Sequence, residues 1–464
     1  WSEDRRAGVP PSDHAPWSES KWNFSLQQLA GAWITQHGRK SISRASLEQL
    51  LGDPGPDVID KFLFRSRLLQ QPGDDVYWLH PTMQEFLASR WLTAQGTAGR
   101  SLIDVIASET ILRHPLEHLV YFYGALAGDE ERRRVAKTVG DAVLAAPSTG
   151  SDTVSMDRRV VVTDVIGRLG SFDTTARFHD PRLTEARRWV TIRSGAFWWG
   201  AENTRVEDAR EFEYQVQRWL TTVAEYEQFM SAWKKGGRST ALRGTRRWGD
   251  CPARSELDKW ITSAKDIAPP SAAWLPRWST QVSLRWNHPV VGVDWFEAMA
   301  FCAWRSEMET DSMMATILPT DLRWEQAARF GATPPTASAR LVDRELDYTW
   351  NDPFGSRRGR RYGRESANTE IAGLGRTSPV GSFPSGESKA GLWDVSGNAW
   401  EWCMSSQTGL PGFIRGGSFR CDADKARCSV RSGCLPSSRD DDLGFRPSRV
   451  SAKLIQEFTW AKFK

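Results

Sequence analysis

GLWDVSGNAWEWC (residues 391–403) is the stretch that decides the fold of this 464-residue chain. It holds three tryptophans and two glycines. The sequence around it reads as short strands, turns and aromatic side chains. Of the 24 tryptophans, 18 follow residue 180, and so do all six cysteines. Residues 1–180 carry a net charge of −3 and the remainder +7, so the sequence indicates two different kinds of domain in one chain.

Two helices are predicted upstream of this stretch from local signals. Asp294 is a good N-cap for the first helix. Thr320 has the same role for the second helix, which is predicted to end at Gly331. The buried side of the first helix is predicted to consist of Trp295, Met299, Cys302 and Ala303.

Other strings stand around the decisive stretch in a fixed order: WVTIRSGAFWWG (189–200), HPVVGVDWFEAMAFCAWRS (288–306), LPTDLRWEQAARFG (318–331) and RGGSF…LGFRPSR (415–449). With YTWNDPF (348–354) and ANTEIAGLGRTSPVGSFP (367–384), they resemble the formylglycine-generating-enzyme or sulfatase-modifying domain, a version of the C-type lectin fold. The resemblance implies an α+β fold class, with a mixed, loop-rich domain over residues 188–450 and a C-terminal tail over 451–464. A lectin-like fold does not by itself imply sugar binding.

Residues 24–150 read as helical, because apolar positions recur three and four apart. A short extended run precedes Thr82, which pairs with Glu85 as a capping box. Helices are predicted over 26–34, 45–51, 58–69, 82–92, 103–111, 116–126 and 129–146.

FLFRSRLLQQPGDDVYWLHPTMQEFLASRWL (62–92) resembles the winged-helix and helical region that follows the nucleotide-binding core of bacterial signalling NTPases of the NACHT/STAND type. The resemblance implies a winged-helix-like region over 1–98 and a helical segment with a connector over 99–187. An ordinary winged helix with further helices is the alternative. The chain contains no Gly-x-x-x-x-Gly-Lys-Ser/Thr pattern, so the ATPase module is expected upstream, where it would also provide any oligomerisation.

Composition disfavours several classes of function. No apolar run approaches the length of a membrane-spanning helix, so no membrane span is expected. Basic residues form no stripe with interleaved aromatics, so nucleic-acid binding is disfavoured. The six cysteines belong to a long chain without a signal peptide, which favours reduced thiols and a cytoplasmic location. The start at Trp1, in a polar stretch, indicates a fragment of a longer protein.

The resemblance raises the question of catalysis. Formylglycine-generating enzymes hold copper between two cysteines spaced close to Cys-x-x-x-x-Cys, and linear thiolate coordination suits this soft metal. Here Cys421 stands at the first position, but the next cysteine is Cys428. We therefore expect no copper and no enzymatic activity in this chain. A copper oxidase with displaced ligands, acting on a peptide cysteine, and a structural accessory domain remain the alternatives.

The resemblance also implies a structural calcium site in the decisive stretch. In the family this loop holds the ion with one side-chain oxygen, two backbone carbonyls and a Glu, and oxygen donors suit a hard cation. Carried over to this sequence, the donors are Asp394, the carbonyls of Gly397 and Ala399, and Glu401. The alternative is an ion-free loop in which Glu401 caps backbone amides.

The segment 413–449 has an unusual composition. Apart from Lys425 it contains no Lys, Glu, Gln, Met or Trp. Codons reached by changing both adenines of AAC or AAT cannot encode those five types. On this fold the pattern resembles the variable proteins of diversity-generating retroelements, whose mutagenesis changes a ligand-binding face. A polar surface loop that lacks those types by chance is the alternative.

We therefore predict a ligand-recognition or sensor module attached to a signalling NTPase, with a protein, cell-surface or phage ligand as partner. Phe419 and Leu435 are predicted to be anchors or core. The residues predicted to face the ligand, called here the variable face, are Arg420, Cys421, Asp422, Asp424, Ser432, Gly433, Cys434, Ser437, Ser438, Asp440, Asp441 and Asp442.

Overall fold

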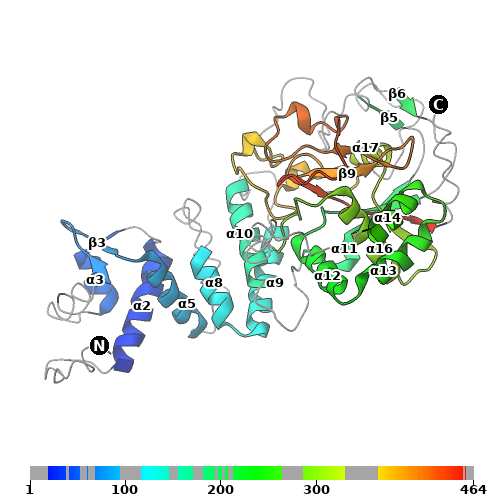
Figure 1. Ribbon diagram of the computed structural model, residues 1–464. Coiled ribbons are helices and arrows are strands. Elements are labelled where there is room, and N and C mark those ends of the chain that lie inside the picture. The colour runs from blue at the N-terminus through cyan, green and yellow to red at the C-terminus, as the bar shows by residue number, and fades with distance from the viewer. Residues whose placement is uncertain are drawn as a thin grey trace. The chain divides into compact units, whose positions relative to one another are not determined.

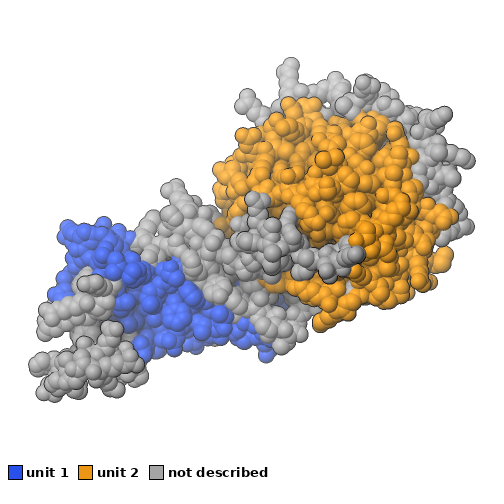
Figure 2. Space-filling model, in the orientation of Figure 1, with its two compact units in different colours: residues 1–139, 168–174 blue, residues 140–167, 175–464 orange. Residues whose placement is uncertain are grey.

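The computed structural model describes residues 19–37, 41–52, 60, 68–94, 117–145, 155–170, 180, 182–193, 197–200, 204–206, 213–263, 286–329, 364–452 and 455. These residues fall into two compact units, 1–139 with 168–174 and 140–167 with 175–464 (Figure 2). None of the described helices combines the length and apolarity that a membrane span needs.

The first unit combines helices with a small antiparallel sheet in the order β1-β3-β2. Helix α3 begins after Ser43, whose side chain accepts a hydrogen bond from the Ser46 amide, and ends at Gly52 with φ of 69°. Buried apolar side chains such as Trp33 and Leu47 form the core. The elements are α2 (Glu19–His37), β1 (Ile42–Ser43), α3 (Arg44–Leu51), β2 (Leu69–Gln70), β3 (Asp75–Trp78), α5 (Pro81–Ala94), α8 (Glu117–Leu126) and α9 (Asp129–Ala145), whose residues after 139 belong to the second unit.

Five of the predicted N-terminal helices, 26–34, 45–51, 82–92, 116–126 and 129–146, match described helices. The capping box at Thr82 is wrong, because α5 already begins at Pro81. The Glu85 carboxylate accepts a hydrogen bond from the amide of Leu119 on α8 at 2.9 Å. The predicted helix 103–111 and most of 58–69 lie outside the described residues.

The second unit is built on two four-stranded sheets and a hairpin, β5-β6. One sheet, β4-β7-β13-β8, is antiparallel and pairs strands from both ends of the domain. The other, β11-β10-β9-β12, is antiparallel except that β12 runs parallel to β9. Their strands are β4 (Trp189–Arg193), β5 (Phe197–Trp199), β6 (Thr204–Val206), β7 (Glu213–Gln217), β8 (Met314–Ile317), β9 (Trp400–Met404), β10 (Pro411–Arg415), β11 (Arg431–Gly433), β12 (Leu443–Phe445) and β13 (Ser448–Ser451).

Helices α12 (Val223–Lys234), α13 (Gly237–Thr245), α14 (Pro252–Ser263) and α16 (Trp295–Met308) gather beside these strands (Figure 1). Asp294 caps α16 as predicted and forms a full capping box with Glu297. The four side chains predicted for the buried side of α16 are all 0% exposed. Thr320 caps α17 (Asp321–Arg329), since its hydroxyl accepts from the Arg323 amide. The mixed α+β class is therefore confirmed.

The segment expected as a connector contains a helix, α10 (Met156–Gly170), whose residues up to 167 belong to the second unit. Met156 and Val160 pack against Ala372 and Phe383. The Asp164 carboxylate lies 2.6 Å from Nε2 of the buried His288 and 2.9 Å from Nη2 of Arg376. His288 lies 124 positions and Arg376 lies 212 positions from Asp164 in the sequence, so these contacts are long-range.

Candidate ligand-binding face and its buried frame

The frame of the candidate site is a buried ion pair between Glu401 on β9 and Arg446 after β12. The two side chains are 0% and 1% exposed, and Nη2 of Arg446 lies 2.8 Å from Oε1 of Glu401. The indole N–H of Trp324 donates to the other oxygen at 2.6 Å. Arg446 also donates to the carbonyls of Gln217, Arg218 and Trp393. This one guanidinium therefore joins three separate chain segments.

A second buried arginine, Arg415 at the end of β10, holds the base of the following loop. Its Nη2 donates to Glu325 on α17 at 2.9 Å, and both side chains are 0% exposed. Its Nη1 donates to the carbonyls of Cys428 and Val430, each at 3.1 Å. The loop between β10 and β11 is thus fixed at its returning end, whatever side chains it carries at its tip.

The predicted variable face is largely accessible. Four of its twelve residues, Cys434, Ser438, Asp441 and Asp442, are half-buried. The exposed residues are Arg420, Asp422, Asp424, Ser432, Gly433, Ser437 and Asp440. Of the two predicted anchors, Leu435 is 73% exposed and Phe419 is buried in the core.

Cys421 is a correction to the predicted face. Its side chain is 7% exposed, and its thiol lies 3.5 Å from the hydroxyl of the buried Ser418. The Cys421 carbonyl accepts from the amide of Glu370, which pins this point of the loop to another segment. With so little of its side chain exposed, Cys421 belongs to the support of the face and not to its contact surface.

One ion pair and one hydrogen bond join the loop after β10 to the loop before β12. Arg420 forms a two-pronged pair with Asp441, at 2.7 Å for each prong. Ser418 donates to Asp442 at 2.6 Å. The two loops therefore form one continuous surface, on which the charges of Arg420 and Asp441 are paired.

Arg439 attaches the same surface to the N-terminus of α16. It lies 2.6 Å from Asp294 and 2.8 Å from Glu297, the two residues of the capping box. Burial raises the pKa of Glu297 to about 7, the neighbouring Asp294 charge adds to this rise, and Arg439 opposes it. Burial also raises the pKa of Asp294. The amide of Trp295 donates to the carbonyl of Pro436, so the loop is held by backbone as well.

Three of the four predicted calcium donors, the side chains of Asp394 and Glu401 and the Gly397 carbonyl, already accept hydrogen bonds within the chain. Both oxygens of Glu401 accept hydrogen bonds from Arg446, so a positively charged guanidinium already lies against this carboxylate. Asp394 accepts from the Gly381 amide, and the Gly397 carbonyl accepts from the amide of Ala399. Among the described residues no group of three or more His, Cys, Asp or Glu side chains is arranged to hold a metal. Calcium binding by this loop stays an untested prediction.

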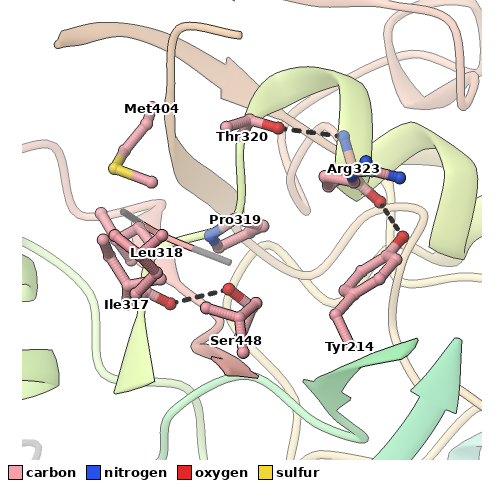
Figure 3. A pocket seen from close by; sticks show the side chains of 10 residues that line it. Tyr214, Ile317, Leu318, Pro319, Thr320, Arg323, Met404 and Ser448 are labelled. Carbon is pink, nitrogen blue, oxygen red and sulfur yellow. Dashed lines mark hydrogen bonds between the residues drawn. The ribbon is translucent and has the colours of Figure 1, made fainter. Parts of the chain in front are cut away.

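A small cavity is lined by residues that include Tyr214, Leu318, Arg323, Met404 and Ser448 (Figure 3). Its volume is about 30 Å³, little more than a water molecule needs, and its lining is mainly apolar. The polar groups at its edge are paired: Tyr214 donates to the Arg323 carbonyl and Ser448 to the Ile317 carbonyl. This cavity is too small for a substrate.

Comparison with known proteins identifies a matching family. Residues 175–450 match the sulfatase-modifying factor enzyme 1-like domain. The formylglycine-generating enzyme of Streptomyces coelicolor is 33% identical over 193 residues, which are 36% of this chain and 54% of that protein. The inactive C-alpha-formylglycine-generating enzyme 2 of Bos taurus is 33% identical over 168 residues, 34% of this chain and 49% of that protein. The chain thus spans about half the length of these relatives.

Among solved structures, Treponema denticola variable protein 1 has 16% identity and a TM-score of 0.29, and the alignment covers 56% of this chain and 94% of that chain.

The expectation that this chain is not an enzyme is contradicted by these relatives. One of them carries the name of an active enzyme and another that of an inactive one, at the same identity. The altered cysteine spacing that led to the expectation concerns a single metal ligand, whereas the similarity extends along the domain. The family model covers more than half of the chain, and the protein therefore belongs to the sulfatase-modifying factor enzyme 1-like domain family, whose fold is C-type lectin-like.

Proposed function

We propose that the C-terminal domain recognises a protein, cell-surface or phage ligand through the variable face. The observation that carries this proposal is the contrast between accessible loop side chains and the buried charges beneath them. Arg415 fixes the carbonyls of Cys428 and Val430, while Asp422 and Asp424, which lie between Arg415 and Cys428 in the sequence, are exposed. Side chains on such a fixed loop can change without a change of fold, and they lose little entropy on binding.

We further propose that this face is diversified at the level of DNA, as in diversity-generating retroelements. The composition of residues 413–449 supports this, since the exposed positions other than Lys425 carry types reachable from AAC or AAT codons. The flanking DNA tests it. A near-copy of the 3′ coding segment that differs mainly at adenines, beside a reverse-transcriptase gene, is the expected result. An absence of any such copy in the complete genome would contradict diversification.

For the first unit we propose a winged-helix region that follows a signalling NTPase core. The order helix, strand, helix, strand, strand and the sheet order β1-β3-β2 support a winged helix. In this proposal the C-terminal domain is the sensor and the NTPase is the effector. Full-length protein with the upstream module, if it hydrolyses ATP faster with ligand than without it, supports the assignment; equal rates contradict it.

Ligand recognition is tested by capture with matched variants. We would immobilise the chain and offer a phage and a bacterial outer-surface protein fraction. Asp422→Ser, Asp424→Ser and Asp440→Ser together should reduce specific capture at least tenfold. The control changes the same number of acidic residues on and between α12 and α14: Glu227→Gln, Asp250→Asn and Glu256→Gln. If the control variant loses capture equally, the face is assigned wrongly.

A catalytic function is the second candidate, and the similarity to a named formylglycine-generating enzyme favours it. Cys421 occupies the position of the first copper-binding cysteine and lies buried beside Ser418. Copper content and oxygen consumption with a cysteine-containing peptide test this candidate. Stoichiometric Cu(I) binding that is lost in Cys421→Ser, with turnover of the peptide, would establish an oxidase.

A further inference from the structure

Arg431, the first residue of β11, lies against two aromatic rings and a carboxylate from other elements. Its guanidinium carbon is 4.9 Å from the ring centre of Trp199 on β5 and 4.8 Å from that of Phe413 on β10. Its Nη1 lies 3.1 Å from Oδ2 of Asp321, the first residue of α17. Both ring distances are short enough for cation–π contacts. Together Trp199, Phe413 and Asp321 form what we call the cation slot.

The floor of the cation slot is charged and fully buried. Asp321 is 0% exposed, and its Oδ1 accepts from the Ser406 amide at 2.8 Å. Its Oδ2 faces Arg431. A buried carboxylate that loses its cation is costly, so this slot requires a positive group at the position of the guanidinium.

The side chain of Arg431 is more exposed than the carboxylate at the floor of the cation slot. The Arg431 side chain is 40% exposed, and β11 is the edge strand of its sheet. Asp321, by contrast, belongs to a helix whose nine residues are all buried. The slot therefore persists when the residue at 431 changes, because its walls and floor belong mainly to the support.

We propose that the cation slot is a binding site for a guanidinium or ammonium group, and that residue 431 decides whether the slot is filled from within or by a ligand. With arginine at 431 the slot is closed. With a small neutral residue it is open to a basic side chain of the ligand, so this single exchange switches the face between two specificities. The biological part of this inference rests on the proposed recognition function, whereas the slot itself does not.

Chemical rescue tests the slot without any macromolecular ligand. Arg431→Ser should lower Tm, and methylguanidinium should restore part of the loss. At ten times its Kd the saturable rise is about 3 °C. N-methylurea, which has nearly the same shape and no charge, should give no rise. The parent protein should show no saturable response to methylguanidinium, because Arg431 fills the slot.

A double variant, Arg431→Ser with Asp321→Asn, assigns the rescue to the carboxylate. It should lose at least tenfold in affinity for methylguanidinium. Arg431→Gln serves as a second opened variant if Arg431→Ser does not fold. Equal responses of parent and opened variant, or rescue by N-methylurea, would overturn the proposal.

A short peptide extends the test from the small probe to a ligand-like molecule. N-acetyl-arginine amide should bind the Arg431→Ser protein at least tenfold more tightly than its citrulline counterpart, which is uncharged. Equal affinities for the two would contradict recognition of a basic side chain. If methylguanidinium rescues Arg431→Ser but the variable face captures no macromolecule, the cation slot is supported and the recognition function is contradicted. If the face captures a macromolecule but rescue fails, recognition is supported and the cation slot is contradicted.

Discussion

The pairs Arg446–Glu401 and Arg420–Asp441 have the same chemistry in two different surroundings. Both join a guanidinium to a carboxylate through two nitrogens. The first is 1% and 0% exposed, the second 55% and 38%. Removing one partner of a buried pair leaves an uncompensated charge in a low dielectric, whereas water replaces a lost partner at the surface. Similar contacts therefore carry the fold in one place and can vary in the other.

The largest expected effect comes from breaking the buried pair. Arg446→Met keeps much of the side-chain volume but leaves the Glu401 carboxylate without its guanidinium, which should cost about 3–5 kcal/mol of unfolding free energy. Arg420→Met removes the same group from the surface and should cost less than about 1 kcal/mol. Urea unfolding of both variants measures the difference.

The control for this comparison is Arg446→Met combined with Glu401→Gln. The amide oxygen can still accept from Trp324, and the buried charge is gone, so the double variant should recover part of the loss. A double variant less stable than Arg446→Met alone would mean that the buried charge is not the source of the cost.

The tryptophans of β9 offer a second test of frame against surface. Trp402 is 0% exposed and donates to the Val293 carbonyl at 2.9 Å, so Trp402→Ala should cost about 3–5 kcal/mol. Trp400 is only partly buried, and its substitution by Ala should cost clearly less. Thermal melts of the two variants rank them, and a larger loss for Trp400→Ala would reverse their roles.

Asp394 should be a case in which removing a buried charge stabilises the frame. Burial raises its pKa to about 6. The ionised form is thus disfavoured in the folded state, so this residue lowers stability as pH rises from about 4 to 6, and the full cost is present above pH 6. Asp394→Asn keeps an acceptor for the Gly381 amide, and Asn tolerates the observed φ of 53°.

We expect Asp394→Asn to gain up to about 3 kcal/mol at pH 8 and nothing at pH 4. Denaturant unfolding at both values measures this gain. A gain of equal size at both would show that the titration of Asp394 is not the cause.

What could be predicted from sequence depended on the distance between interacting residues. Asp294 and Glu297 lie three positions apart, so the capping box is visible as a local pattern. Asp164 and His288 lie 124 positions apart, and nothing near either residue marks α10 as part of the domain.

The site follows the same rule. The loops of the face were located from composition and from the flanking glycine motifs. The burial of Cys421 depends on Ser418 and on the distant Glu370. The role of Arg431 depends on Trp199 and on Asp321, which are both far from it in the sequence. The sequence predicted which segment is exposed, but it did not indicate which side chains of that segment support it.

The smallest effects are expected within the acidic triplet of the face, and they should not be equal. Asp440 is exposed, so Asp440→Ser should change the unfolding free energy by less than about 0.5 kcal/mol. Asp441→Asn weakens the pair with Arg420 and should cost less than about 1 kcal/mol. Asp442→Ala removes the acceptor of the buried Ser418 hydroxyl and should cost about 1–3 kcal/mol.

Combined replacement of all three aspartates should therefore cost little more than Asp442→Ala alone, because the hydrogen bond from Ser418 assigns most of the cost to Asp442. Urea unfolding of the three single variants tests this order. Because the Asp442 carboxylate is needed by Ser418 and not by the charge of the loop, Asp442→Asn should keep most of the stability that Asp442→Ala loses. If Asp442→Asn is as unstable as Asp442→Ala, the charge of Asp442 supports the frame. Asp442 would then belong to the support, and the variable face would end at Asp441.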